Sequence, residues 1–170
     1  MLVSGSDTDT TEHGALAPWR DDNLVQHANR LVRSFRQVVG RDLIEQGPDA
    51  LETARRLFEA PFVVLSHGVQ DDPVLNYGNA CALALWEMSF ANFTLMPSRV
   101  TAEAMLREER ERLLAIAALK GFIDDYAGVR ISSSGRRFKI ANAIIWNVTD
   151  EQGARVGQAA TFDRWADIQE

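Results

Sequence analysis

Residues 62–86, FVVLSHGVQDDPVLNYGNACALALW, decide which fold the chain can adopt. The segment opens with β-branched, aromatic and aliphatic residues at 62–65, which favour a buried strand. Asp71-Asp72-Pro73 has the side-chain acceptors and the fixed φ of a tight turn, and a short second strand follows. Asn79 stands at the N-cap of residues 80–86, which are apolar on nearly every side and therefore form a buried helix. We expect this stretch to form one edge of the core and one wall of any pocket.

Composition and charge restrict the class of protein. The 170 residues fit one domain with spare length at its ends, and a hydrophobic share of 46% suffices for a sizeable core. A net charge of −6 argues against binding to nucleic acid or to an anionic membrane surface. The single cysteine, Cys81, excludes an intrachain disulfide, and the N-terminus has no signal-peptide pattern. We expect a cytoplasmic protein with no nucleic-acid and no membrane partner.

The N-terminal third divides into a tail and a helical extension. Residues 1–20 are rich in Ser, Asp, Thr and Gly without an apolar period, which predicts a disordered tail. Residues 21–60 form the extension: an amphipathic helix comes first, and Asp49 can cap a second helix over 50–59. The main domain then covers residues 61–166. The apolar stripe of the first helix comprises Leu24, His27, Leu31, Phe35, Val38 and Val39.

The C-terminal half changes from a helical to a strand period. Thr101 can cap a long helix that runs to Lys120 and stops at Gly121. From Phe122 the apolar period is two, and three strands over 122–132, 137–149 and 157–162 are joined by short turns, as in an antiparallel meander. Together with the two earlier strands, they predict an α+β fold with a five-stranded antiparallel sheet and helices on one face.

The middle strand of the meander sets the faces of the sheet. Alternation places Phe138, Ile140, Ile144, Trp146 and Val148 on one face, interrupted by Asn142. The opposite face is too apolar to be fully exposed to solvent, so we expect the N-terminal helix or a second subunit to cover part of it. This gives two routes to a homodimer, through the N-terminal helix or through an open sheet face.

The order of elements is that of a Per-Arnt-Sim (PAS) domain, and short motifs carry a more specific resemblance. The chain resembles the MEKHLA domain family, PAS-like modules of bacterial proteins and of plant homeodomain–leucine zipper proteins, over about residues 43–165. We expect a stand-alone member of the bacterial type. The resemblance implies a PAS-like fold and a role in sensing, ligand binding or protein–protein contact. The motifs are Ala60-Pro61-Phe62, Leu65-Ser66-His67, Asn76-Tyr77-Gly78-Asn79, Leu85-Trp86-Glu87, Pro97-Ser98-Arg99, Thr101-Ala102-Glu103, Tyr126-Ala127-Gly128-Val129-Arg130-Ile131, Gly135-Arg136-Arg137-Phe138, Ile145-Trp146-Asn147 and Gly157-Gln158-Ala159-Ala160-Thr161-Phe162.

Polar residues among apolar ones mark a candidate pocket, because ligand sites are mostly apolar with a few placed polar groups. Asn142 and Gln158 fit this description, with a cross-strand hydrogen bond as the alternative. Arg99 and Arg130 could hold a carboxylate or phosphate, although a salt bridge from Arg99 to Glu87 or Glu103 is the alternative for that residue. Aromatic residues could line the walls or simply fill the core. The candidate ligand-binding residues are Asn142, Gln158, Trp86, Phe90, Trp146, Arg99, Arg130 and His67, with Phe93 as a further wall residue.

His67 is the centre of the only enzyme-like cluster that the sequence offers. It follows Ser66 directly, but adjacent strand residues point to opposite faces and cannot form a nucleophile–base pair. Asp71 and Asp72 could complete a metal or acid–base site, yet the pattern matches no recognised motif. The simpler expectation is a turn histidine hydrogen-bonded near Asp71 or Asp72. We assign no catalytic residue and no metal ligand.

Two cofactors are disfavoured. Light-oxygen-voltage domains carry their flavin-reactive cysteine in a motif on a later helix, whereas Cys81 lies at the start of the first PAS helix, so a covalent flavin does not fit. The predicted helix over 101–120 contains no histidine that could ligate haem. We therefore expect a PAS-like sensory domain that binds an unidentified small molecule and signals through self-association or a partner protein. The alternatives are a ligand-free interaction module and a small enzyme built around His67.

Overall fold

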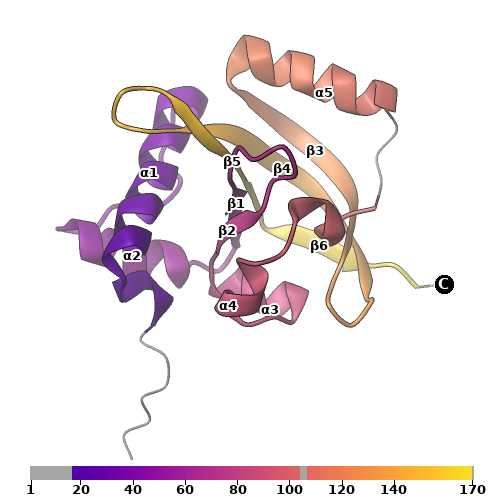
Figure 1. Cartoon of the computed structure of the whole chain (residues 1–170), viewed down its shortest axis with the longest axis horizontal. Helices are drawn as coiled ribbons and strands as arrows, with labels where there is room; N and C mark the ends of the chain where they lie inside the picture. The colour runs from indigo at the N-terminus through magenta and orange to yellow at the C-terminus, as the bar shows by residue number, and fades with distance from the viewer. Residues whose placement is uncertain (1–16, 104–106, 170) are drawn as a thin grey trace, which may run out of the picture.

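The structure, a computed structural model, describes residues 17–103 and 107–169 (Figure 1). Most of the tail predicted over 1–20 lies outside these residues. The helical elements are η1 (Pro18–Arg20), α1 (Asp22–Val39), α2 (Ala50–Phe58), α3 (Ala80–Trp86), α4 (Phe90–Phe93), η2 (Ser98–Thr101) and α5 (Arg107–Lys120). The strands are β1 (Val63–His67), β2 (Leu75–Gly78), β3 (Phe122–Ile131), β4 (Arg137–Thr149), β5 (Arg155–Phe162) and β6 (Arg164–Asp167). None of the described helices is both long and apolar enough to cross a membrane.

Side chains cap the helices where the sequence predicts helix starts. The carboxylate of Asp21 accepts hydrogen bonds from the amides of Asn23 and Leu24, and Asp49 accepts one from Glu52. Such caps satisfy amides that have no partner inside the helix. Gly40 ends α1 in the left-handed conformation, with φ of 84°, which glycine adopts without a steric penalty. These local signals explain why α1 and α2 begin where the sequence predicts.

The sheet is antiparallel throughout, with the strand order β2-β1-β5-β4-β3. The five predicted strands are present, and the two early strands lie beside the meander as expected. A sixth strand, β6, was not predicted. It continues along the same edge of β4 past a bend at Asp163, so that β5 pairs with the second part of β4 and β6 with the first part.

A bulge in β4 corrects the predicted faces of the sheet. Asn142 has a φ of 54°, and the pairing of β3 with β4 shifts by one residue between Ile140 and Ala143. An extra residue in a strand inverts the alternation that follows it. Phe138 and Ile140 therefore face one side of the sheet, whereas Trp146 faces the other, and the single face predicted for these residues was wrong. Ile144 and Val148 lie on the same side as Trp146.

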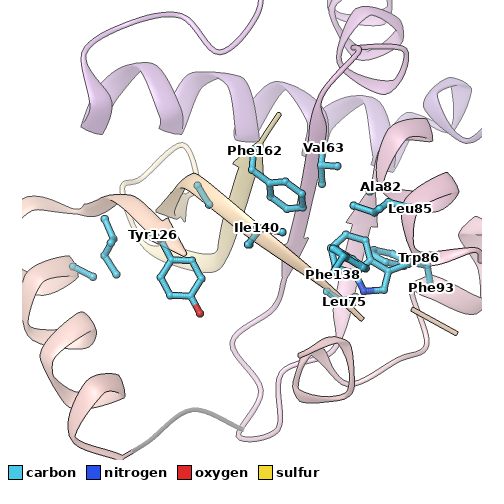
Figure 2. Close-up of a cluster of buried hydrophobic side chains, with 13 residues drawn as sticks. Val63, Leu75, Ala82, Leu85, Trp86, Phe93, Tyr126, Phe138, Ile140 and Phe162 are labelled. Carbon is cyan, nitrogen blue, oxygen red and sulfur yellow. The ribbon is translucent and has the colours of Figure 1, made fainter. Parts of the chain in front are cut away.

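Helices cover both faces of the sheet: α3, α4 and α5 lie on one face, and the predicted N-terminal helical extension, α1 with α2, lies on the other. We call the cluster around Trp86 and Phe138, on the side of α3, α4 and α5, the inner core (Figure 2). The cluster beneath α1 and α2, which includes Phe35 and Trp146, is the outer core. The N-terminal helix thus covers the apolar sheet face, as one of the two alternatives predicted. The open sheet face proposed as a dimer contact is consequently occupied in this structure.

The segment before α5 also differs from the prediction. Thr101 belongs to η2 and does not cap the long helix, which begins at Arg107. Ala102 instead forms an isolated β-bridge with Arg130, and this extended backbone cannot continue a helix. Glu103 reaches Arg137, with 2.6 Å between Oε1 and Nε. Residues 104–106, which belong to the helix predicted over 101–120, lie outside the described residues. The predicted stop at Gly121 is confirmed, with φ of 78°.

Candidate functional site

A cavity of about 150 Å³ lies between the inner face of the sheet and the segment around η2. Strands β1, β4 and β5 supply its apolar lining, with Leu65, Ile140 and Phe162 among the side chains. The lining is apolar in most places and contains a few polar groups, which is the usual composition of a ligand pocket. Figure 2 shows that Tyr126 lies on one side of Ile140 and that Trp86 and Phe138 lie on the other.

The strand register explains why these residues meet. Leu65 on β1 pairs with Ala160 on β5, and His67 pairs with Gln158, so alternate residues of both strands reach the same face. On β4 the bulge at Asn142 turns Ala143 and Ile145 toward this face. Without the extra residue, Ile144 and Trp146 would take their places. Asn142 therefore does not line the pocket itself, but its bulge determines which side chains of β4 do.

Four of the predicted ligand-binding residues lie together around the cavity: His67, Trp86, Arg130 and Gln158. His67 is fixed by a contact of 2.8 Å between Nδ1 and the carbonyl oxygen of Gly68. The guanidinium group of Arg130 donates to the carbonyl of Val129 at 3.1 Å. These contacts hold both polar side chains in defined positions at the cavity wall.

Trp86 contributes a buried donor that has no partner. Its side chain is fully buried, and within the described part of the chain its Nε1 forms no hydrogen bond. The ring packs edge-on against Phe138, with 5.3 Å between centroids, and against Phe162, with 6.2 Å. A buried N–H without an acceptor is unfavourable by about 1–3 kcal/mol, so a ligand or water acceptor in the cavity would stabilise it.

The other four predicted residues lie outside the cavity. Asn142 is exposed at the bulge, and Arg99 pairs with Asp72 at 3.2 Å with 70% of its side chain exposed. The salt-bridge alternative for Arg99 was right in kind but wrong in partner, because it named Glu87 or Glu103. Phe90 packs edge-on against Tyr77, with 6.4 Å between centroids. Trp146 and Phe90 belong to the outer core, and Phe93 to the inner core.

The cluster proposed around His67 is not assembled. The ring of His67 bonds to the backbone of Gly68, while Asp72 is engaged by Arg99. Asp71 and Asp72 are both exposed. The simpler expectation, a hydrogen-bonded turn histidine, agrees with the contact between His67 and the carbonyl of Gly68. In residues 17–103 and 107–169, no three His, Cys, Asp or Glu side chains gather to form a metal site.

Cys81 and His27 are titratable groups outside the cavity. Cys81 is half-buried on α3, and burial raises the pKa of its thiol, which keeps it protonated and weakly reactive. On the outer face, burial and, to a smaller extent, the neighbouring charge of Arg30 lower the pKa of His27 to about 4. Nε2 of His27 contacts Oγ of Ser66 at 2.8 Å. Its position in the apolar stripe of α1 was the sequence signal for this buried histidine.

Sequence reasoning missed several residues of the pocket wall. Ser98 and Thr101 of η2 and Tyr126 of β3 line the cavity. Thr101 was assigned to a helix cap, because a hydroxyl before a helical period is the usual cap signal. Tyr126 directly follows Asp125, which has a φ of 56° and lies at a register shift that interrupts the strand period of β3.

Comparison with known proteins gives a family and a fold. The MEKHLA domain family matches residues 25–167. No protein among the curated sequences matches this chain. The PAS domain of a protein from Colwellia psychrerythraea has a TM-score of 0.53 and 13% identity, with 68% of this chain and 92% of that domain covered.

Two light-oxygen-voltage proteins share the same fold. The fungal blue-light photoreceptor Vivid, solved as a light-state dimer, has a TM-score of 0.50 and 15% identity, covering 76% of this chain and 90% of Vivid. An RNA-binding light-oxygen-voltage receptor has a TM-score of 0.53 and 18% identity over 66% of this chain, but only 31% of the receptor is covered. At these identities the likeness establishes the fold alone.

Proposed function

Because this chain belongs to the MEKHLA domain family and has a PAS-like fold, we propose that it is a sensory domain that binds a small molecule between sheet and helices. The signal then leaves through self-association or through a partner protein. The observation that supports this proposal is the cavity of about 150 Å³, with polar groups from three different strands at its wall. A fully packed interaction module would have side chains in this space.

The cavity has the size of a site for a small ring. An apolar cavity of about 150 Å³ in another protein admits benzene, and the present lining adds polar groups that can orient a ligand. In this proposal His67, Arg130 and Gln158 contact the polar part of the ligand, and Trp86 donates from the wall. The apolar part rests on the inner face of the sheet.

A single layer of backbone separates this pocket from helix α1. Ile145 lines the cavity, and its neighbour Trp146 packs edge-on against Phe35 of α1, with 4.9 Å between ring centroids. On β5, Gln158 likewise lines the cavity, and its neighbour Ala159 packs in the outer core. In this proposal, a ligand that is bound better in one arrangement of β4 and β5 biases the packing of α1.

The position of α1 bears on how two copies could associate. α1 and α2 cover the sheet face that would otherwise be available to a second copy. A dimer in which two sheet faces meet therefore requires α1 to leave, whereas a dimer through the exposed side of α1 does not. Ligand binding and association are coupled in the first arrangement, because both act on the contact between Phe35 and Trp146.

Native mass spectrometry and an absorption spectrum of the freshly purified protein test the proposal. We expect an added mass from a copurified small molecule, and its loss when Ala143→Leu fills the cavity. Ala127→Leu, at an exposed position on β3, is the matched control and should keep the added mass. An added mass that survives in Ala143→Leu would place the ligand elsewhere. A bare chain mass, together with no binding of any probe to the cavity, would favour the interaction module.

A further inference from the structure

The wall of the cavity carries a positive charge that has no counter-ion among the described residues. Arg130 holds the only permanent charge among the described lining residues, and neither Asp nor Glu is among them. Its guanidinium group contacts the carbonyl of Val129 and, at 3.4 Å, the hydroxyl of Tyr126. Among the described residues, no carboxylate lies within 4.0 Å of it. Other arginines of this chain, such as Arg30 and Arg137, form ion pairs.

The local sequence holds this guanidinium in place. Tyr126, Gly128 and Arg130 follow each other at every second position of β3, and Arg130 lies over the Tyr126 ring, 5.4 Å from its centroid. A Cβ atom on Gly128 would lie 2.8 Å from the Tyr126 hydroxyl and 3.1 Å from Nη1 of Arg130. Glycine thus allows the two side chains to meet across it. An arginine held on an aromatic ring loses little freedom when it binds a carboxylate.

We propose that the pocket takes a small organic monocarboxylate, whose carboxylate binds Arg130 and whose apolar body lies on the inner face of the sheet. This inference rests on the proposed function. A guanidinium group binds a carboxylate through two parallel hydrogen bonds. A single cation suits one negative charge better than the two of a phosphate monoester, because a second buried charge would lack a partner. Trp86 and Gln158, which also line the cavity, carry neutral N–H donors.

The size of the cavity limits the body of the acid. About 150 Å³ admits a benzene-sized group, and Leu65, Ile140 and Phe162 provide apolar contacts for it. Benzoate is therefore a suitable probe. Benzyl alcohol has a similar shape without the charge, and inorganic phosphate has the charge without the apolar body.

Calorimetric titration of the full chain with these three probes tests the inference. We expect benzoate to bind, benzyl alcohol to bind on the order of tenfold more weakly, and phosphate to bind more weakly still. Arg130→Gln should weaken benzoate binding by about 10- to 100-fold and remove its advantage over benzyl alcohol. Arg130→Lys should fall between, since lysine keeps the charge but not the paired hydrogen bonds. Arg99→Gln, which alters an exposed arginine outside the cavity, is the control and should bind as the parent does.

The outcomes separate this inference from the function on which it rests. Two results would overturn the proposal of a monocarboxylate ligand: equal binding of benzoate and benzyl alcohol, or benzoate binding that is unchanged in Arg130→Gln. If Ala143→Leu blocks both probes in that case, the proposed pocket still stands. Probe binding that persists in Ala143→Leu would overturn the pocket itself. No binding of benzoate at millimolar concentration would also overturn the inference, while a copurified neutral ligand would uphold the proposed function. If circular dichroism shows that Arg130→Gln does not fold, Gly128→Ala is the second test. This change displaces the guanidinium group and should weaken the binding of benzoate but not that of benzyl alcohol.

Discussion

Nε2 of His27 on α1 lies 2.8 Å from Oγ of Ser66 on β1, and this contact joins the N-terminal helix to the sheet. Ser66 in turn donates to Oδ1 of Asn76 at 2.5 Å. The serine oxygen must therefore accept from His27, which places the proton of the neutral imidazole on Nε2. The ring of Tyr77 lies beside it, with 5.9 Å between centroids, and Arg30 is the neighbouring charge.

His27 should make the folded protein less stable in acid. Its pKa is about 4 in the folded state against 6.5 as the ordinary value, so between these values the unfolded chain binds more protons. This contribution is complete above pH 6.5 and is lost as the pH falls toward 4, by on the order of 3 kcal/mol. Urea unfolding at several pH values measures it. In His27→Gln the loss of stability over this window should be smaller; an identical pH dependence would contradict the assignment.

Asn79 should be among the least replaceable polar residues. Its fully buried side chain accepts from the amides of Val64 and Ala82, both at 3.1 Å, and donates to the carbonyls of Leu57 and Phe62. Asn79→Ala removes all four of these hydrogen bonds and should lower the free energy of unfolding by about 3–4 kcal/mol. Chemical denaturation measures this difference.

Ser89→Ala provides the matched comparison, because Ser89 caps α4 through a single exposed hydrogen bond to Asn92. That change should lower the free energy of unfolding by about 1 kcal/mol or less. Similar losses in the two variants would show that Asn79 acts only as a helix cap.

The bulge at Asn142 should tolerate glycine but not a β-branched residue. Because φ is 54° there, Asn142→Gly should leave the stability unchanged or raise it slightly, whereas Asn142→Val should lower it by about 1–2 kcal/mol. Thermal unfolding of both variants gives the comparison. Lys139→Val is the control at an exposed position of the same strand. If valine were harmless at 142, the left-handed conformation would not be needed for the bulge.

Gly157 and Gly135 should respond to alanine for different reasons. A Cβ atom on Gly157 would lie 2.4 Å from the carbonyl oxygen of His67, so strands β1 and β5 must move apart. Gly135 has open space around it and carries only the strain of a φ of 84°. Alanine at 135 should lower the free energy of unfolding by about 1 kcal/mol, and alanine at 157 by more, about 2–3 kcal/mol. Denaturation curves of the two variants measure these losses. A larger loss for Gly135→Ala than for Gly157→Ala would refute the steric explanation.

The parts of the fold that local chemistry controls could be predicted from the sequence. Asn79 as a cap, Gly121 as a helix end and the three strands of the meander depend on neighbours in sequence, and the structure confirms them. The family resemblance to MEKHLA is confirmed as well, since the family matches residues 25–167.

The errors have a common physical cause in contacts between distant segments. Nothing local indicates that Asn142 takes a left-handed φ, yet that one residue decides which face Trp146 occupies. The partner of Arg99 is Asp72, 27 residues earlier, and a pattern of short spacings does not reveal it. Four candidate residues lie at one cavity because strand pairing brings them together, and their role as ligand contacts remains a prediction for the titrations above to test.

The partners of α1 also constrain the order in which the protein can fold as it is synthesised. Oγ of Ser34 accepts from the amide of Thr149, 115 residues further along the chain, and Arg30 pairs with Glu151. The helix leaves the ribosome first, but its docking surface on β4 and β5 is completed only when most of the chain has been translated. Such distant contacts slow folding. Until then, Phe35 lacks its edge-on partner Trp146, and a chaperone that shields apolar segments would have a site on α1.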